Sequence, residues 1–115
     1  MVWDPARITT KSWANVVELY RHLSDRNEDF RPMRELVEHV ASTAYEPPVF
    51  AATSGTALLV ARDAYANWND DALRIDVDLG GSIRFVLPRK GHGPPASFEC
   101  DGRRIIQTFE SHLPR

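Results

Sequence analysis

The chain is poor in cysteine, and this limits how its fold can be stabilised. Cys100 is the single cysteine among 115 residues, so an internal disulfide is excluded. The start, Met1-Val2-Trp3-Asp4-Pro5, has neither the basic segment nor the apolar segment of a signal peptide. These two features are typical of a protein in a reducing compartment, and we therefore expect a cytoplasmic location.

Long apolar runs and an excess of one charge are lacking as well. No apolar run approaches the ~20 residues that a membrane-spanning helix requires. The chain has 14 Lys and Arg residues against 16 Asp and Glu residues, which gives a net charge of −2. Proteins that bind nucleic acid by neutralising phosphates, or anionic lipid by charge, need a basic balance instead. We expect neither a nucleic acid nor a membrane as partner.

Residue types that bind metals are present but scattered. The histidines show no His-x-x-x-His spacing, and one cysteine cannot make a Cys-x-x-Cys pair. Cys100 lies between Glu99 and Asp101, whose negative charges raise the pKa of a thiol and disfavour the reactive thiolate. We expect no metal site and no cofactor. The four histidines are His22, His39, His92 and His112.

The apolar content is sufficient for one core. Hydrophobic residues make up 43% of the chain and aromatic residues 10%, which is typical of a folded protein. A chain of 115 residues is the size of one ordinary domain. We therefore predict a single domain that spans residues 1–115.

Three segments have apolar residues at intervals of three and four, the spacing of a helix with one buried face. The first helix should begin near residue 10 or 12 and end by residue 27. The second should begin near residue 29 or 32, and Glu46-Pro47-Pro48 stops helical structure after it. Asp101 should cap the third. The expected buried residues are Trp13, Val16, Val17, Tyr20 and Leu23, then Met33, Leu36, Val37, Val40, Ala41 and Ala44, and finally Ile105, Ile106, Phe109 and Leu113.

Residues 49–62 predict a hairpin that turns at Ser54-Gly55 and is apolar on both faces. Strands of this kind are usually covered on both sides. We expect either helices on both faces or a second subunit on one of them, which would make a homodimer. One face should hold Val49, Ala51, Leu58 and Val60, and the other Phe50, Ala52, Leu59 and Ala61.

Residues 73–87 predict a second hairpin around Gly80-Gly81. A two-residue loop would pair Val77 with Arg84 and mix charged and apolar residues on both faces. A three-residue loop, residues 80–82, instead pairs apolar residues with each other and Asp78 with Arg84. We predict the three-residue loop, with Leu79 opposite Ile83, Val77 opposite Phe85 and Ile75 opposite Leu87.

These elements, with a short strand at residues 97–100, define the expected fold class. It is α+β, with an N-terminal helical hairpin, a four- to five-stranded mainly antiparallel sheet and a C-terminal helix.

Acidic residues gather in and around the strand that precedes the Gly80-Gly81 turn. Asp76 and Asp78 should share the face of the sheet that points away from the core. Complementary charge steers a basic partner, and aromatic residues supply anchors, so this face is our candidate for partner binding. The plainer interpretation is that outward strand residues are simply polar. The acidic residues are Asp63, Asp70, Asp71, Asp76 and Asp78, and the candidate binding residues are Trp68, Asp71, Asp76, Asp78 and Arg84.

A second candidate is the loop Arg89-Lys90-Gly91-His92-Gly93. Its two cations and one histidine could supply an acid or base and charge stabilisation next to a phosphodiester. The alternative function is therefore a small nuclease-like enzyme or toxin that uses His92, Arg89 and Lys90. The plainer interpretation is a surface loop, because no second acid or base lies nearby.

No motif identifies a family. In size, charge and layout, the chain is similar to two classes of small bacterial protein. Immunity proteins and antitoxin-like inhibitors are compact acidic α+β domains that mask a basic toxin surface, and secretion chaperones are small, acidic and dimeric. The similarity implies a non-catalytic protein-binding or accessory protein of a bacterial cytoplasm, and this is the function that we expect.

Overall fold

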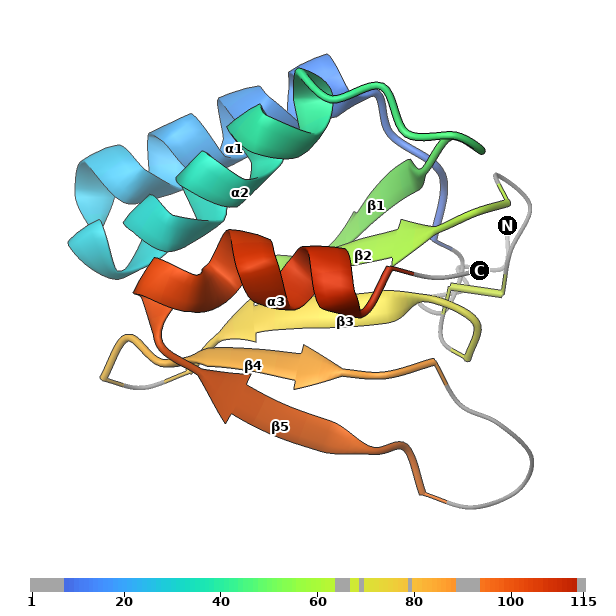
Figure 1. The fold of residues 1–115 in the computed structure, drawn as a ribbon. Coiled ribbons are helices and arrows are strands. Elements are labelled where there is room, and N and C mark those ends of the chain that lie inside the picture. The colour runs from blue at the N-terminus through green and yellow to red at the C-terminus, as the bar shows by residue number, and fades with distance from the viewer. Residues whose placement is uncertain (1–7, 64–66, 69, 79, 89–93, 114–115) are drawn as a thin grey trace, which may run out of the picture.

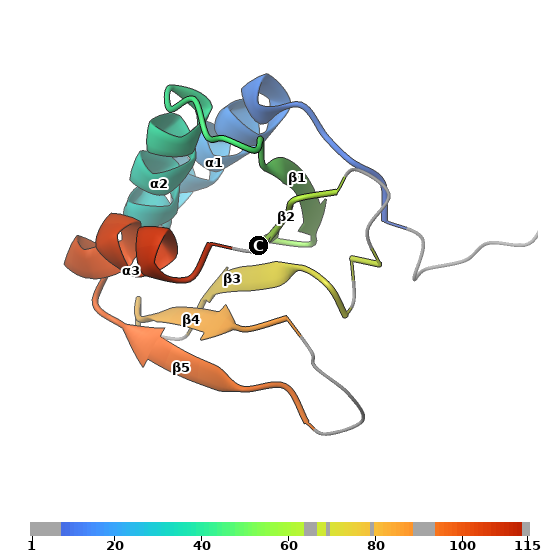
Figure 2. The ribbon, with the colours of Figure 1, turned by 45° about the vertical axis from the view of Figure 1, so that its right-hand side comes forward.

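The computed structural model describes residues 8–63, 67–68, 70–78, 80–88 and 94–113. Three α-helices lie on one side of a five-stranded antiparallel sheet whose strands follow chain order (Figures 1 and 2). This arrangement confirms the α+β class with an N-terminal helix pair and a C-terminal helix. The elements are α1 (Trp13–Arg26), a 3-10 turn (Glu28–Phe30), α2 (Arg31–Ala41), β1 (Phe50–Ser54), β2 (Ala57–Ala61), β3 (Leu73–Val77), β4 (Ile83–Val86), β5 (Ser97–Cys100), a 3-10 turn (Gly102–Arg104) and α3 (Ile105–Ser111).

The first two helices begin and end where their local chemistry requires. The Ser12 hydroxyl caps α1 by accepting a hydrogen bond from the Asn15 amide at 3.2 Å. Asn27 ends α1, and its side chain accepts from the Asp29 amide at 3.0 Å to begin the next turn. Ala41 and Ala44, expected in the buried stripe, are exposed. That expectation was wrong because α2 ends at Ala41, so the chain leaves the helical path before the stripe continues.

Two side chains of α1 attach it to the β1–β2 hairpin. The Trp13 Nε1–H donates to the Val49 carbonyl at 3.0 Å, and the Tyr20 hydroxyl donates to the Thr56 carbonyl at 2.8 Å. Burial raises the pKa of Tyr20 well above its ordinary value of 10.0, so the hydroxyl stays protonated as this bond requires. These bonds place α1 over one end of the sheet.

The β1–β2 hairpin has the two apolar faces expected for it. Ala51, Leu58 and Val60 face the helices and belong to the main core. The opposite face packs against Trp68, from the connection between β2 and β3, and against Ile8. Trp68 and Ile8 of the same chain therefore take the place of the helix or second subunit that was expected to cover this face, and the homodimer stays a prediction.

The β3–β4 pairing differs from the prediction by two residues. Val77 pairs with Ile83, and Asp76, not Asp78, lies opposite Arg84. The Asp78 amide donates to the Ser82 carbonyl at 2.8 Å, so Ser82 belongs to the pairing and not, as predicted, to the loop. Leu79, which was predicted to lie opposite Ile83, is outside the described residues. A shift of two leaves each side chain on its predicted face, because side chains alternate with a period of two. The apolar residues still face the core, although the charged partners are different.

No helix in the described ranges is long and apolar enough to cross a membrane.

Candidate partner-binding face of the sheet

The face of the sheet that points away from the helices divides into two regions, and we call it the outer face. Over β1 and β2 it is apolar and is covered by Trp68 and Ile8. Over β3, β4 and β5 it is charged, and no described helix lies on it (Figure 2). Its side chains in this second region are Arg74, Asp76, Arg84, Val86, Ser97 and Glu99.

The strand register brings three charged residues into one row across the outer face. Asp76 of β3 lies opposite Arg84 of β4, and Arg84 lies opposite Glu99 of β5. Directly opposed residues in antiparallel strands have neighbouring side chains, so Arg84 stands between Asp76 and Glu99 in the row. Arg74 adds an ion pair on the same face, with its Nη2 atom 3.8 Å from Asp76 Oδ2.

Asp78 extends this row beyond the end of β3. Its carboxyl group shares a hydrogen bond with that of Glu99, which raises the pKa of Glu99, and the negative charge of Asp78 adds to the effect, whereas Arg84 opposes it. Two adjacent carboxyl groups resist full ionisation because their charges repel. The charge row therefore ends in a local excess of negative charge, at the candidate residue Asp78.

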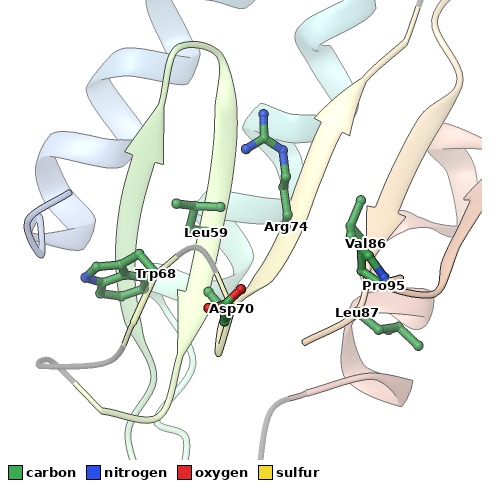
Figure 3. A pocket seen from close by; sticks show the side chains of 8 residues that line it. Leu59, Trp68, Asp70, Arg74, Val86, Leu87 and Pro95 are labelled. Atoms are coloured by element: carbon green, nitrogen blue, oxygen red, sulfur yellow. The ribbon is translucent and has the colours of Figure 1, made fainter. Parts of the chain in front are cut away.

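A hollow of about 110 Å³ opens on the outer face beside the charge row, and we call it the outer hollow. Figure 3 shows Trp68 and Leu59 on one side of it and Val86 and Pro95 on the other. Asp70 and Arg74 are its two charged lining residues. It is lined by Leu59, Trp68, Asp70, Ala72, Arg74, Val86, Leu87 and Pro95.

Trp68 and Asp71, two of the residues predicted for binding, occupy different environments. Trp68 is 6% exposed and packs on Ala52, Leu59 and Ala61, so its indole covers the sheet. Asp71 is exposed and lies in a tight turn, in which its amide donates to the Asn67 carbonyl at 2.7 Å. The structure thus brings Asp76, Asp78 and Arg84 together with Glu99, whereas Trp68 is buried over the neighbouring strands β1 and β2.

Sequence reasoning missed Arg74 and Glu99. Both occupy outward positions of their strands, and the alternation of polar and apolar residues in 73–77 and 97–100 contains the signal. What was absent from the sequence was the order of the strands, which brings β5 beside β4.

The loop candidate His92, Arg89 and Lys90 lies outside the described residues, and its predicted role stays a prediction. Within the described ranges, no group of three or more His, Cys, Asp or Glu side chains could hold a metal ion.

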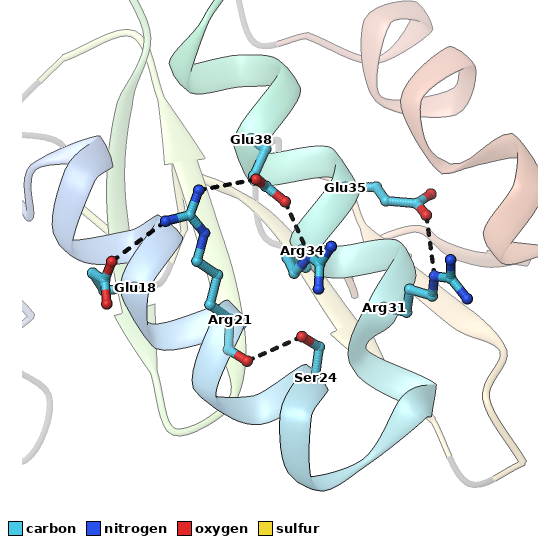
Figure 4. Close-up of polar contacts among 7 residues, drawn as sticks. All are labelled: Glu18, Arg21, Ser24, Arg31, Arg34, Glu35 and Glu38. Carbon is cyan, nitrogen blue, oxygen red and sulfur yellow. Dashed lines mark hydrogen bonds and ion pairs between the residues drawn. The ribbon is translucent and has the colours of Figure 1, made fainter.

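The helical side of the molecule has ion pairs that join α1 to α2 (Figure 4). Arg21 of α1 lies 3.1 Å from Glu38 of α2 and 3.5 Å from Glu18, and Arg34 lies 3.0 Å from Glu38. Hydrogen bonds from Arg21, and then from Arg34, hold the pKa of Glu38 below its ordinary value of 4.5. Each charge here is compensated by a neighbour, so we assign this network to helix packing.

A second polar cluster attaches α3 to α2. Glu110 Oε1 lies 2.9 Å from His39 Nε2 and accepts from the Tyr45 hydroxyl at 3.1 Å. Burial, and then the bond to Glu110, raises the pKa of Tyr45 to about 12. The polar groups of this trio contact one another, so it is also assigned to packing.

We compared the chain with protein-family models, curated proteins and solved structures, and found no match in any of the three.

Proposed function

We propose that the protein is a non-catalytic binding or accessory protein that recognises a basic protein partner through the outer face of β3, β4 and β5. The observation that supports this proposal is the uncovered charge row of Asp76, Arg84 and Glu99. Among the described residues of the outer face and its hollow, there are more carboxylates than guanidinium groups. The carboxylates are Asp70, Asp76, Asp78 and Glu99, and the guanidinium groups are Arg74 and Arg84.

Charge complementarity gives this face a preferred partner. Charges across an interface steer encounter and disfavour partners of like charge. The raised pKa of Glu99 reflects negative charge that a partner's lysine or arginine would compensate. The charge row contains both positive and negative side chains, so it also fixes the orientation of a partner. A partner bound in a rotated orientation would place like charges opposite each other.

Binding by the face is favoured over addition of a strand at the sheet edge. β5, the last strand in the sheet order, has only four residues. The Leu87 amide donates to the Ala96 carbonyl at 2.9 Å, so by alternation Ser97 and Glu99 direct their backbone groups away from β4. A short edge with a charged residue is a common protection against strand addition.

Site-specific photo-crosslinking in the native host tests this proposal. A photoreactive amino acid at Ser97 should crosslink to a basic protein, whereas one at the exposed Ala14 of α1 should not. Glu99→Lys should abolish the crosslink, and the matched change Glu18→Lys, at an exposed glutamate of α1, should leave it intact. Equal crosslinking from both positions, or a crosslink that survives Glu99→Lys but not Glu18→Lys, would overturn the proposal.

A further inference from the structure

We propose that the outer hollow is the receiving pocket for a lysine or arginine side chain of the partner. This inference rests on the proposed function and names the chemistry by which the outer face would select its partner. The aliphatic stem would lie between Leu59 and Val86, and the cationic end would contact Asp70.

The size and the lining of the hollow fit the aliphatic stem of a lysine or arginine better than an aromatic ring. Its volume is about 110 Å³, below the roughly 150 Å³ of an apolar cavity that accommodates benzene. Most of its described lining residues are apolar, among them Leu59 from β2, Val86 from β4 and Pro95 from the segment before β5. Lysine and arginine bury their methylene stems against such surfaces while the charged end stays in contact with water or a counter-charge.

The acidic lining residue has a defined orientation. The Asn67 side-chain amide donates to Asp70 Oδ2 at 3.1 Å, and the Asp70 amide donates to the Asn67 carbonyl at 3.1 Å. These bonds belong to the turn that also places Trp68 on the sheet. The turn therefore fixes the carboxylate at the hollow, which lowers the ordering cost of binding a cation there.

The other charged lining residue favours the same assignment. Arg74 lies 3.8 Å from Asp76 on the same face, so its guanidinium already has a carboxylate neighbour. An acidic occupant would have to compete with Asp76 and would meet Asp70. A basic occupant meets Asp70 and leaves the Arg74–Asp76 pair in place.

Small-molecule probes test the pocket without requiring the partner. We would titrate n-butylguanidinium, n-butylammonium, n-butanol and butyrate into the ¹³C-methyl-labelled protein. The two cations should shift the methyl signals of Leu59 and Val86 and saturate at millimolar concentration, about the strength expected for ligands of this size. Butanol and butyrate should bind more weakly by about fivefold, which corresponds to the upper value of an exposed ion pair.

Matched variants test whether the cations bind in the outer hollow. Asp70→Asn should weaken binding of both cations about fivefold and leave butanol unchanged, whereas Asp25→Asn at the exposed end of α1 should change neither. Equal binding of butanol and n-butylguanidinium, stronger binding of butyrate, or no methyl shifts would overturn the inference. If Glu99→Lys abolishes the crosslink but Asp70→Asn has no effect on the cations, the pocket assignment fails and the binding face stands. If the cations bind but no crosslink forms from Ser97, the proposed function fails.

Discussion

Replacement of Trp68 by alanine should destabilise the protein by about 3–5 kcal/mol. The indole is 6% exposed, and a buried aromatic side chain removes roughly 150–250 Å² from water. At about 25 cal/mol per Å², this area corresponds to roughly 4–6 kcal/mol, which is an upper estimate because unfolded chains are partly compact. The sheet beneath the indole presents Ala52, Ala61 and Ala72, which are too short to fill the space that would be left.

Urea unfolding followed by circular dichroism measures this loss as a change in midpoint at constant slope. The expected fall in melting temperature is roughly 10–20 °C. Trp13→Phe is the matched control, since it keeps an aromatic ring and removes the hydrogen bond to the Val49 carbonyl, which should cost about 0.5–1.5 kcal/mol. A loss within about 0.5 kcal/mol for Trp68→Ala, the size of an ordinary surface substitution, would refute the packing argument.

Three further predictions concern the contacts that join the elements. Gly102→Ala should cost about 1–3 kcal/mol in urea unfolding, because a Cβ atom there would lie 2.5 Å from Pro32 Cγ; an unchanged midpoint would contradict this contact. Glu38→Gln should lower stability by at most about 1 kcal/mol. The depressed pKa of Glu38 gives stability that is present above its ordinary 4.5 and is lost as the pH falls through the lowered value, so the variant should show a flatter acid profile. The pKa of Tyr45 should be about 12 by ultraviolet titration of its phenolate, and its raised pKa gives stability that is present below pH 10 and lost as the pH rises toward 12. Glu110→Gln should lower that pKa, and no change would exclude the hydrogen bond as a cause.

The proposed function and the packing of Trp68 are connected through the same turn. The turn formed by Asn67, Asp70 and Asp71 places the indole on the apolar end of the outer face and the Asp70 carboxylate at the hollow. A variant that removes the indole is therefore expected to disturb the hollow as well. For this reason the binding tests leave Trp68 intact.

In the 73–87 hairpin, the sequence indicated which face of the sheet each side chain occupies. It did not indicate which residues pair across the two strands. Alternation determined that Ile75 and Phe85 face the core, and both are buried. Registers that differ by two residues give the same faces, so alternation could not distinguish them. The observed register is fixed by contacts outside the hairpin. Ile75 lies opposite Leu58 of β2, and Phe85 stacks on Phe98 of β5 with ring centroids 5.4 Å apart.

The burial of Trp68 is a second feature that local sequence patterns could not predict. Trp68 was predicted as a binding residue of the outward face, whereas it is 6% exposed, because local sequence contains no record of the distant residues that bury it. The apolar outward positions of β1 and β2 did require a cover, and a helix or second subunit was the natural expectation. The connection between β2 and β3 supplies that cover instead, which only the path of the chain could reveal.

The amino-acid sequence by itself determined the helices, the strands, their buried sides and the absence of a disulfide, because these follow from periodicity, capping and residue type within a few positions. The tertiary structure decided which charges meet across strands, that Trp68 covers the sheet, and that Asp70 and Arg74 line the same hollow. These features depend on contacts between segments that are far apart along the chain, and local patterns contain no information about such contacts.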